Sequence, residues 1–461
     1  MAKQHPLVSE LRAVQKKHGK FESLELLVPD LSGILKGKRI RPNDFEKSCT
    51  GGFVFCAGTT LLTTLGETVS GIPYGEDDGD PDLPAKIIPG SISPVPWARK
   101  PAGQALFTLE HEDGSPFFAD PRNVLERALQ PLRKMGLTAV VATELEFYLL
   151  DANSRDPAIG TPKVPGTDRP QPGTQVYHPD DLYEVEEFLD DVYAWCDAQR
   201  VPAEAAISEY SPGQFEINLH HVDDPILACD HAVLLKRIIK AAARKHGFIA
   251  CFMAKPFEQD AGNGLHIHMS LVDKNGKNYF SQDREKLSLP PFSARLRHAV
   301  GGLLKLMPEA TLLGAPNANS YRRLRPEMFA PVEPNWGVNH RVVSVRIPQS
   351  DEKNLRFEHR TSGADANPYL VMAAVVAGVH HGLKNKIDPG PLVALQAKIV
   401  PKLKIPNRWD AAIDKFSRSK VLPEYLGKDY CKYYAMNRRS EAEKFHNQIS
   451  QLDFDWYLRA V

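Results

Sequence analysis

The sequence has no excess of charge of either sign, since its 57 lysines and arginines balance 57 aspartates and glutamates. A protein without net charge has no long-range field that gathers nucleic acid or an anionic membrane, so we expect neither as a partner. Long apolar runs are also missing. The longest, residues 369–379, is too short to cross a bilayer, and residues 1–14 lack the apolar centre of a signal peptide. We therefore expect a soluble protein that acts on small molecules.

Cysteine is scarce, with six in 461 residues and no CxxC spacing. This pattern argues against a zinc ribbon and a dense disulfide framework, and it indicates a reducing cytoplasm. Two common nucleotide-binding signatures are absent as well, because no GxxxxGK[ST] loop occurs and no GxGxxG follows a predicted strand. Any bound nucleotide would have to be held by metal ions and arginines.

The length of 461 residues predicts two domains, because a single hydrophobic core stops growing at roughly 250 to 300 residues. We place the boundary within 112–119, which divides the chain into residues 1–115 and 116–461. A helix over 6–19 followed by a hairpin is expected in the first part, and 152–175 should be a long surface loop. In the second part we expect strands at 139–150, 214–220, 249–254, 265–271 and 341–347, and helices at 122–135, 181–198, 227–246, 294–307 and 367–385.

Carboxylates and imidazoles recur at the two-residue spacing that places side chains on one face of a strand. The pattern occurs at Glu144 and Glu146, at Gln214, Glu216, Asn218 and His220 with Glu209 just before them, at His266 and His268, and at Arg356, Glu358 and Arg360. Any one of these segments could be the solvent face of a half-buried sheet. Together they indicate the walls of one polar cleft.

Neighbouring carboxylates repel each other unless cations lie between them. Five glutamates and a histidine suit two or three hard cations, because oxygen ligands favour Mg²⁺ or Mn²⁺ and a single imidazole is tolerated best by Mn²⁺. Zinc is disfavoured by the ligand pattern: His266 and His268 lie two apart on a strand, not four apart on a helix, and no cysteine lies beside them.

Arginines towards the C-terminal end supply the opposite charge: Arg322, Arg323, Arg325, Arg341, Arg346, Arg356 and Arg360. Guanidinium groups match carboxylate and phosphate oxygens, and arginines with metals are the usual means of stabilising a transferring phosphoryl group. An arginine-rich stretch is otherwise a solvated face or a nucleic-acid surface, but aromatic interleaving and net positive charge are missing here.

These motifs resemble those of glutamine synthetases, and more closely the branch that joins glutamate to organic amines, the γ-glutamylpolyamine synthetase group. The matching segments, in the family's order, are PDLSGILKGK (29–38), ELEFY (144–148), EYSPGQFE (209–216), FMAKP (252–256), GNGLHIH (262–268), NSYRR (319–323) and NPYL (367–370). The resemblance implies an α+β fold, with a small N-terminal β-grasp domain and a large catalytic domain in which helices flank an antiparallel sheet. It also implies homo-oligomeric rings, hexamers or dodecamers, whose active sites are shared between neighbouring subunits.

The resemblance also implies a role for each matching residue. One metal would be held by Glu146, Glu209 and Glu216, and the other by Glu144, His266 and Glu358. The substrate glutamate would be bound by Arg323 and the Gly262 backbone, while Arg341 and Arg360 would contact its γ-carboxylate and the phosphoryl group; these two arginines and Glu358 are the expected catalytic residues. ATP would be bound by His268, Ser270, Arg346 and Arg356.

Two departures from ammonia-using enzymes concern the nucleophile. Where those enzymes read DGSS this chain has Ala57 followed by Gly-Thr-Thr, and where they place a flap glutamate before Ala-Pro this chain has Phe329. Loss of two acidic groups weakens binding of ammonium and leaves room for a carbon-bearing amine, so Ala57 and Phe329 are expected to line the amine site. Glu327 and Glu333 flank Phe329, however, and a shifted loop could restore a carboxylate. Ala261 also replaces the family's usual asparagine.

The expected reaction is ATP-dependent ligation of the glutamate γ-carboxylate to a monoamine or polyamine through γ-glutamyl phosphate, in amine catabolism, with Mg²⁺ or Mn²⁺ as cofactor. Phe329 favours an apolar tail, whereas a polyamine needs a partner for its second ammonium, and both classes stay open. The alternatives are an ammonium-using glutamine synthetase, phosphorylation of another acid, and a non-catalytic homologue. Retention of all five metal carboxylates argues against the last.

Overall fold

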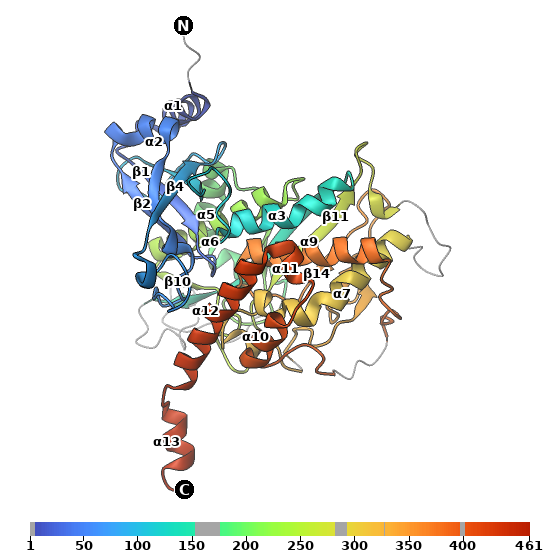
Figure 1. The fold of residues 1–461 in the computed structure, drawn as a ribbon. Helices are drawn as coiled ribbons and strands as arrows, with labels where there is room; N and C mark the ends of the chain where they lie inside the picture. The colour runs from blue at the N-terminus through green and yellow to red at the C-terminus, as the bar shows by residue number, and fades with distance from the viewer. Residues whose placement is uncertain (1–4, 153–175, 282–292, 327, 397–401) are drawn as a thin grey trace.

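Two β-sheets and the helices that cover them organise the protein (Figure 1). The computed structural model describes residues 5–152, 176–281, 293–326, 328–396 and 402–461. Nearly all of the predicted loop at 152–175 lies outside these residues, as does Glu327. Within the described residues the mixture of sheets and flanking helices agrees with the predicted α+β class.

The N-terminal sheet has six strands in the order β2-β1-β6-β4-β3, with β5 paired to β6. Its strands are β1 (Ser23–Pro29), β2 (Leu35–Ile40), β3 (Phe53–Cys56), β4 (Asp82–Ile87), β5 (Ser93–Pro94) and β6 (Ala102–Leu109). The predicted helix is α1 (Pro6–His18), and β1 and β2 form the predicted antiparallel hairpin. Since β1 and β6 are parallel, this sheet is mixed and is consistent with a small N-terminal domain. The boundary at 115/116 stays a prediction.

The larger sheet has eight strands in the order β12-β13-β14-β11-β7-β9-β8, with β10 paired to β7. Its strands are β7 (Thr138–Asp151), β8 (Ala203–Ser208), β9 (Gln214–Leu219), β10 (Phe248–Cys251), β11 (Leu265–Val272), β12 (Trp336–Val338), β13 (Val345–Ile347) and β14 (Phe357–His359). The pairs are antiparallel except β12 with β13. One residue of each alternating pair enters the core, as Leu145, Ile217 and Ile267 do, which leaves the polar residues on the opposite face.

Three helices begin at a capping side chain that is followed by proline. Asp120, Asp224 and Asn367 each accept backbone N–H groups of the first turn, and a proline occupies the next position, where its missing N–H costs nothing. The helices of the larger part are α3 (Pro121–Lys134), α4 (Asp180–Tyr183), α5 (Glu186–Gln199), α6 (Pro225–Lys245), α7 (Ala294–Gly314), α8 (Ser320–Arg323) and α9 (Pro368–Asn385). The predicted helices are present, except that the one expected over 181–198 is interrupted at Glu184 and Val185 and forms two helices, α4 and α5.

Three further predicted boundaries were wrong. The strand expected over 249–254 is β10, which ends at Cys251. The helix expected over 294–307 continues through Pro308 to Gly314, because Thr311, Leu312 and Leu313 gain burial in the core. Of the strand expected over 341–347, only the last three residues form a strand, β13. Arg341 and Val342, at its expected start, are exposed.

Close approach of α7 and α9 requires glycine. A Cβ atom added to Gly302 would lie 2.1 Å from the carbonyl oxygen of Gly378, and one added to Gly382 would lie 2.0 Å from that of His298. No side chain fits at such distances, so these glycines set the spacing of the two helices. The two helices lie side by side (Figure 1).

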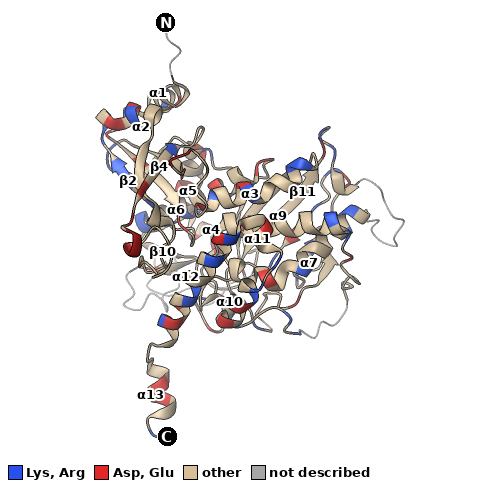
Figure 2. Cartoon of the chain, viewed as in Figure 1, with Lys and Arg blue, Asp and Glu red and all other residues tan. Residues whose placement is uncertain are grey.

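The C-terminal helices were not predicted from the sequence: α10 (Trp409–Ser417), α11 (Leu422–Leu426), α12 (Lys428–His446) and α13 (Gln451–Tyr457). Helix α12 returns to the N-terminal part, where Asn437 Nδ2 donates to the Leu61 carbonyl at 2.6 Å and Arg438 donates to Ser32 Oγ at 3.1 Å. Basic and acidic residues alternate along α12 (Figure 2).

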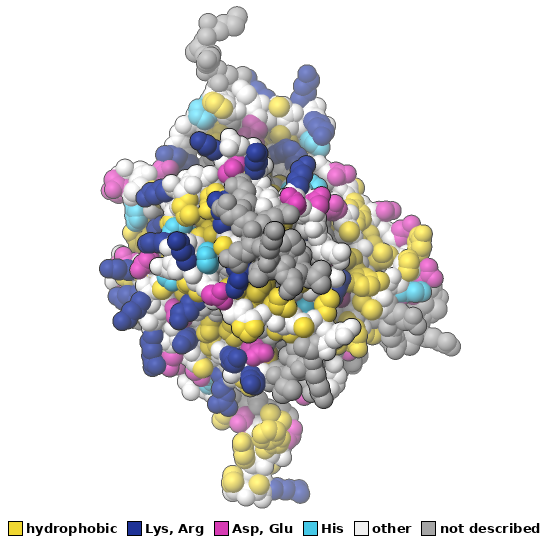
Figure 3. All heavy atoms as spheres, turned by 90° about the vertical axis from the view of Figure 1, so that its right-hand side faces the viewer, with side chains coloured by type: hydrophobic (Ala, Val, Ile, Leu, Met, Phe, Trp, Pro, Cys, Tyr) yellow, Lys and Arg dark blue, Asp and Glu magenta, His cyan; other side chains and the backbone are white. Residues whose placement is uncertain are grey.

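Helix α13 projects away from the body of the chain (Figures 1 and 3). Its apolar side chains are uncovered, with Leu452 52%, Phe454 51% and Trp456 62% exposed. Among the described helices, none combines the length and the apolar character needed to traverse a bilayer.

Candidate active site

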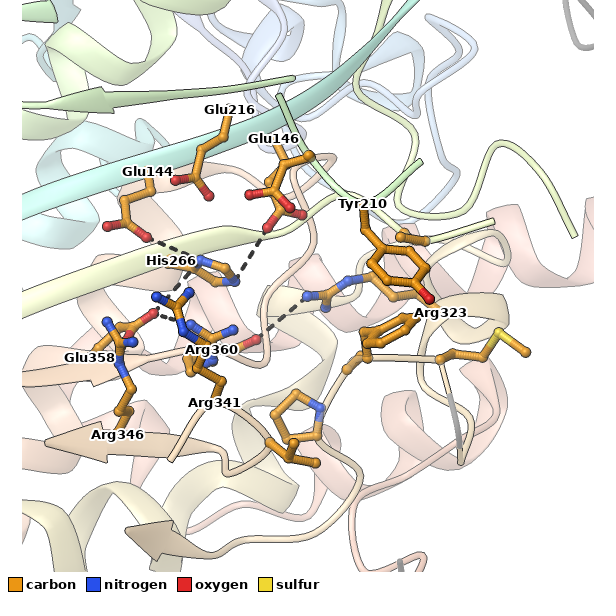
Figure 4. A pocket seen from close by; sticks show the side chains of 18 of the residues that line it. Glu144, Glu146, Tyr210, Glu216, His266, Arg323, Arg341, Arg346, Glu358 and Arg360 are labelled. Atoms are coloured by element: carbon orange, nitrogen blue, oxygen red, sulfur yellow. Dashed lines mark hydrogen bonds and ion pairs between the residues drawn. The ribbon is translucent and has the colours of Figure 1, made fainter. Parts of the chain in front are cut away.

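The register of four strands brings the predicted carboxylates and histidines onto one face of the larger sheet. Glu144 of β7 lies opposite Asn218 of β9 and His266 of β11, and Glu146 lies opposite Glu216. Glu358 of β14 lies opposite His268 and Arg346. Figure 4 shows Glu144, Glu146 and Glu216 above His266, with Glu358 and the arginines below it. The alternation seen in the sequence therefore becomes one wall of a cavity.

Hydrogen bonds fix Glu144 at the centre of this wall. His268 Nε2 lies 2.9 Å from Glu144 Oε1, His266 Nδ1 lies 3.2 Å from Glu144 Oε2, and Asn218 Nδ2 donates to Oε1 at 3.1 Å. Burial alone would raise the pKa of Glu144, but the hydrogen bonds to the two histidines hold it well below its usual range.

The pKa values of two neighbouring carboxylates shift in the opposite direction. The pKa of Glu209 is raised to about 7, mainly by burial and next by the nearby charge of Glu146. Burial together with the charges of Glu144, Glu146 and Glu209 raises the pKa of Glu216 well above its usual range. A site that crowds carboxylates in this way is suited to bound cations, which would relieve the repulsion.

The candidate metal ligands fall into three overlapping groups whose ligand atoms lie within 4.8 Å of one another. The groups are Glu146, Glu209 and Glu216; Glu144, Glu216 and His266; and Glu144, His268 and Glu358. The first is the set predicted for one metal. The set predicted for the other, Glu144, His266 and Glu358, is divided between the second and third groups, although His266 Nδ1 lies only 3.8 Å from Glu358 Oε1.

Arginines face the carboxylates across the cavity. Glu358, whose side chain is fully buried, forms ion pairs with Arg346 and Arg360. Burial would raise the pKa of Glu358, but the charges of Arg360, the two histidines and Arg346 lower it. Arg341 is exposed, and its Nη1 donates to the Tyr177 hydroxyl at 3.0 Å. Arg346 was predicted on the nucleotide side, yet it lines this cavity.

The segment 261–264 passes between the metal-ligand candidates and Arg323. Arg323 is buried and donates to the Thr361 carbonyl at 2.9 Å, and a Cβ atom on Gly262 would lie 2.8 Å from its Cγ. Gln214 Nε2 donates to the Gly262 carbonyl and to Asn263 Oδ1, both at 3.1 Å. These contacts fix the backbone that the sequence predicts to bind glutamate.

Two cavities share the wall formed by Glu144 and Asn218. The larger, of about 740 Å³, is lined by the five glutamates, His266, Gly262, Arg323, Arg341, Arg346, Arg360 and Phe329. The second, of about 560 Å³, is lined by His268, Ser270 and Arg356, three of the four residues predicted to bind ATP. Arg356 Nε donates to His268 Nδ1 at 3.3 Å, which leaves His268 Nε2 to donate to Glu144.

Ala57 does not line either cavity in its own chain. It begins the short 3₁₀ helix Ala57–Thr60 of the N-terminal part and is fully buried. Its role at the amine site stays a prediction, as do the other site assignments. Ala261, by contrast, lines the larger cavity. Its backbone N–H donates to Ser211 Oγ, and its carbonyl accepts from the Tyr148 hydroxyl.

Gln214 and Asn218, which the alternation of residues 214–220 predicted for the wall of the cleft, line the larger cavity. Sequence reasoning missed other lining residues. Tyr177, Tyr210 and Val342 carry no such signal, because they lie outside the regular strands and reach the cavity only through folding.

Many known proteins match this chain over nearly its full length, and three of them are described here. The chain is 40% identical to the γ-glutamylputrescine synthetase PuuA of Escherichia coli (strain K12), over 98% of this chain and 94% of that protein. It is 29% identical to the glutamate–isopropylamine ligase of a Pseudomonas species, over 98% of both chains. It is 30% identical to the γ-glutamylethanolamide synthetase GlnA4 of Streptomyces coelicolor (strain ATCC BAA-471 / A3(2) / M145), over 98% of this chain and 95% of that protein.

Solved structures agree at the level of the fold. The apo form of GmaS without ligand aligns over 97% of this chain and 99% of its own, with a TM-score of 0.81 and 24% identity. In addition, the family profile described as "Glutamine synthetase, catalytic domain" matches residues 118–457. The chain belongs to the glutamine synthetase family.

Proposed function

We propose that this protein is an ATP-dependent ligase that joins the γ-carboxylate of glutamate to an organic amine. The observation that carries the proposal is the pair of adjoining cavities. One combines five glutamates and His266 with four arginines, of which Arg323 is buried, and the other presents His268, Ser270 and Arg356. The relatives named as γ-glutamylputrescine synthetase, glutamate–isopropylamine ligase and γ-glutamylethanolamide synthetase support an amine as the acceptor.

The residues present fit a divalent-metal site. Oxygen ligands dominate each of the three groups, and the repulsion that raises the pKa of Glu209 and Glu216 is what bound cations would remove. We assign Glu146, Glu209 and Glu216 to one Mg²⁺ or Mn²⁺, and Glu144, His266 and Glu358 to another. When bound, the ions would neutralise charge on the transferring phosphoryl oxygens.

The chain's own residues would perform two further tasks. Arg323 and the Gly262 backbone would hold glutamate so that its γ-carboxylate lies beside Arg341 and Arg360. His268, Ser270, Arg346 and Arg356 would hold ATP with its γ-phosphate towards the shared wall. An oxygen of the γ-carboxylate then attacks the γ-phosphorus of ATP and ADP leaves. The deprotonated amine next attacks the carbonyl carbon of γ-glutamyl phosphate, and phosphate departs as the C–O bond breaks. The arginines stabilise the charge that develops in both steps.

The rim of the larger cavity favours an organic amine over ammonium. Phe329 takes the place at which ammonia-using enzymes were expected to carry a glutamate, and it lines this cavity. Glu333 also lines the cavity, but its carboxylate lies 3.4 Å from Lys404 Nζ and accepts from Asn335 at 3.2 Å. An amine with a carbon chain therefore meets apolar surface at this end.

We also propose that the chain assembles into homo-oligomeric rings and works in the cytoplasm. The exposed apolar side chains of α13 support assembly, because such a projecting surface is ordinarily covered by another subunit. Light scattering of the purified protein tests this part: a mass of six or twelve chains is expected, and a monomer contradicts it.

The direct test is phosphate release from ATP with Mg²⁺ or Mn²⁺, glutamate and a panel of amines, together with mass detection of the product. We expect release to require an organic amine and the γ-glutamyl amide to form in equal amount. Efficient glutamine formation at low ammonium concentration would favour the ammonium-using alternative. No stimulation by any amine with either metal would contradict the ligase.

A further inference from the structure

Two aromatic side chains meet at the rim of the larger cavity. The ring centroids of Tyr210 and Phe329 lie 4.6 Å apart with their planes at 47°, although the residues belong to separate segments of the chain. Both line the cavity, and both are largely exposed, Tyr210 by 56% and Phe329 by 61%. Such a contact contributes little to the core, because most of the ring surface remains in water.

Several exposed apolar side chains lie together at the rim. Five large apolar side chains line this one cavity and are at least 44% exposed: Val176, Tyr177, Tyr210, Phe329 and Val342. A concave surface of this kind, beside a few polar groups that fix orientation, is typical of a site for the apolar part of a small ligand.

The backbone of Phe329 is held in an unfavourable conformation. Its φ angle is +60°, in the left-handed region that bulky residues rarely adopt because it strains the backbone. The ring gains little burial in return. The loop therefore directs the ring towards the cavity at a cost to folding, and strain of this kind is concentrated at ligand sites.

Tyr210 also follows directly on Glu209, a candidate metal ligand, and lies beside Arg323 on the side of the cavity away from Glu144 (Figure 4). A chain attached to the amine nitrogen can thus extend from the γ-carboxylate region towards the two rings. Aromatic faces accept aliphatic carbon by dispersion and burial, with no need for a fixed polar partner.

We propose that Tyr210 and Phe329 form an aromatic clamp that binds the carbon chain of the amine and selects primary alkylamines of several carbons over shorter ones. This inference rests on the proposed ligase function. It predicts a change in selectivity among amines. Removing either ring should reduce the preference for a longer alkyl chain, while the binding of glutamate and ATP is unchanged.

The experiment compares kcat/KM for ethylamine, butylamine and putrescine in the full-length protein and its variants Tyr210→Ala, Phe329→Ala and Phe329→Gly. Glycine removes the same ring as alanine but accepts the positive φ, so the two variants separate loss of the ring from backbone strain. Tyr183→Ala is the matched control, because Tyr183 is 69% exposed and does not line the cavity.

We expect the butylamine-to-ethylamine ratio to fall about tenfold in all three rim variants, since two methylene groups lose their contacts, and to stay unchanged in Tyr183→Ala. The KM values for glutamate and ATP should not change. The double variant of Tyr210 and Phe329 should lose less than the product of the single losses, because both rings hold the same chain.

An unchanged ratio in Phe329→Ala and Phe329→Gly overturns the clamp. A loss confined to putrescine also overturns it, because the rings would then act on the distal ammonium and not on the chain. If the unmodified protein forms no amide with any amine, the ligase proposal fails; if it forms amides and only the ratios are insensitive, the clamp alone fails.

Discussion

The two ends of the larger cavity are built in opposite ways. At the inner end, Glu144, Glu358 and His266 lie on paired strands, and their exposure is small. At the rim, Tyr210 and Phe329 lie on irregular segments, and more than half of each side chain is exposed. Strand pairing holds charged groups at fixed separations, which charge stabilisation requires, whereas loops can change composition without disturbing the sheet.

We propose that this difference separates the chemistry, carried by the paired strands, from the selectivity for the amine, carried by the rim. Three relatives of nearly the same length as this chain have names that refer to γ-glutamylputrescine, isopropylamine and γ-glutamylethanolamide. The following variants test this separation.

The largest effect is expected from Glu358→Gln. Glu358 is fully buried and ion-paired with Arg346 and Arg360, so loss of its charge removes a candidate metal ligand and releases both arginines. Amine-dependent phosphate release should fall by about 1,000-fold for every amine in the panel. Glu112→Gln, at an exposed position, is the control. Activity near that of the unmodified protein would remove Glu358 from the catalytic set.

A smaller and more selective effect is expected from Arg323→Lys. The buried guanidinium beside Gly262 can bind a carboxylate bidentately, which an ammonium group cannot. The KM for glutamate should rise about a hundredfold while the KM for ATP stays unchanged. Arg325→Lys, an exposed neighbour outside the cavity, should leave both values unchanged. Parallel increases in both KM values would point to general damage instead.

Gln214→Leu tests whether the 261–264 segment must be held in place. The substitution leaves the Gly262 carbonyl and Asn263 Oδ1 without their donor, although leucine preserves the volume. We expect the KM for glutamate to rise about tenfold, with little change in the butylamine-to-ethylamine ratio. A shift in that ratio equal to the one from Phe329→Ala would show that the two ends are not independent.

The smallest effect on activity is expected from Asp30→Asn, a carboxylate buried outside the cavity. Burial raises the pKa of Asp30 from 3.8 to about 6. Between these two pH values, the folded state therefore keeps a proton on Asp30 that the unfolded state has lost. The free energy of unfolding should therefore decrease as pH rises from about 4 to about 6, by up to about 3 kcal/mol relative to the asparagine variant. Denaturant melts at several pH values measure this difference. Parallel curves for the two proteins would contradict the assignment.

Much of the inner end followed from the sequence. Alternation on 144–146, 214–218 and 266–268 predicted that polar side chains share one strand face, and the strand pairing agrees. This signal is local, since it depends only on the side-chain period of a strand. The helices beyond residue 385 were missed, although α12 ties the two ends of the chain together through Asn437 and Arg438.

Three features depend on the packing of the whole chain: which strands are neighbours, how the candidate ligands divide into groups, and which residues form the rim. Glu216 lies opposite Glu146 because β9 pairs with β7, and Tyr210 meets Phe329 because two loops close over the same cavity. Such contacts join residues distant in the chain, so no local period encodes them. The kinds of side chain on each strand face were enough to predict the type of chemistry, whereas the position that we propose for the amine depends on how the loops pack.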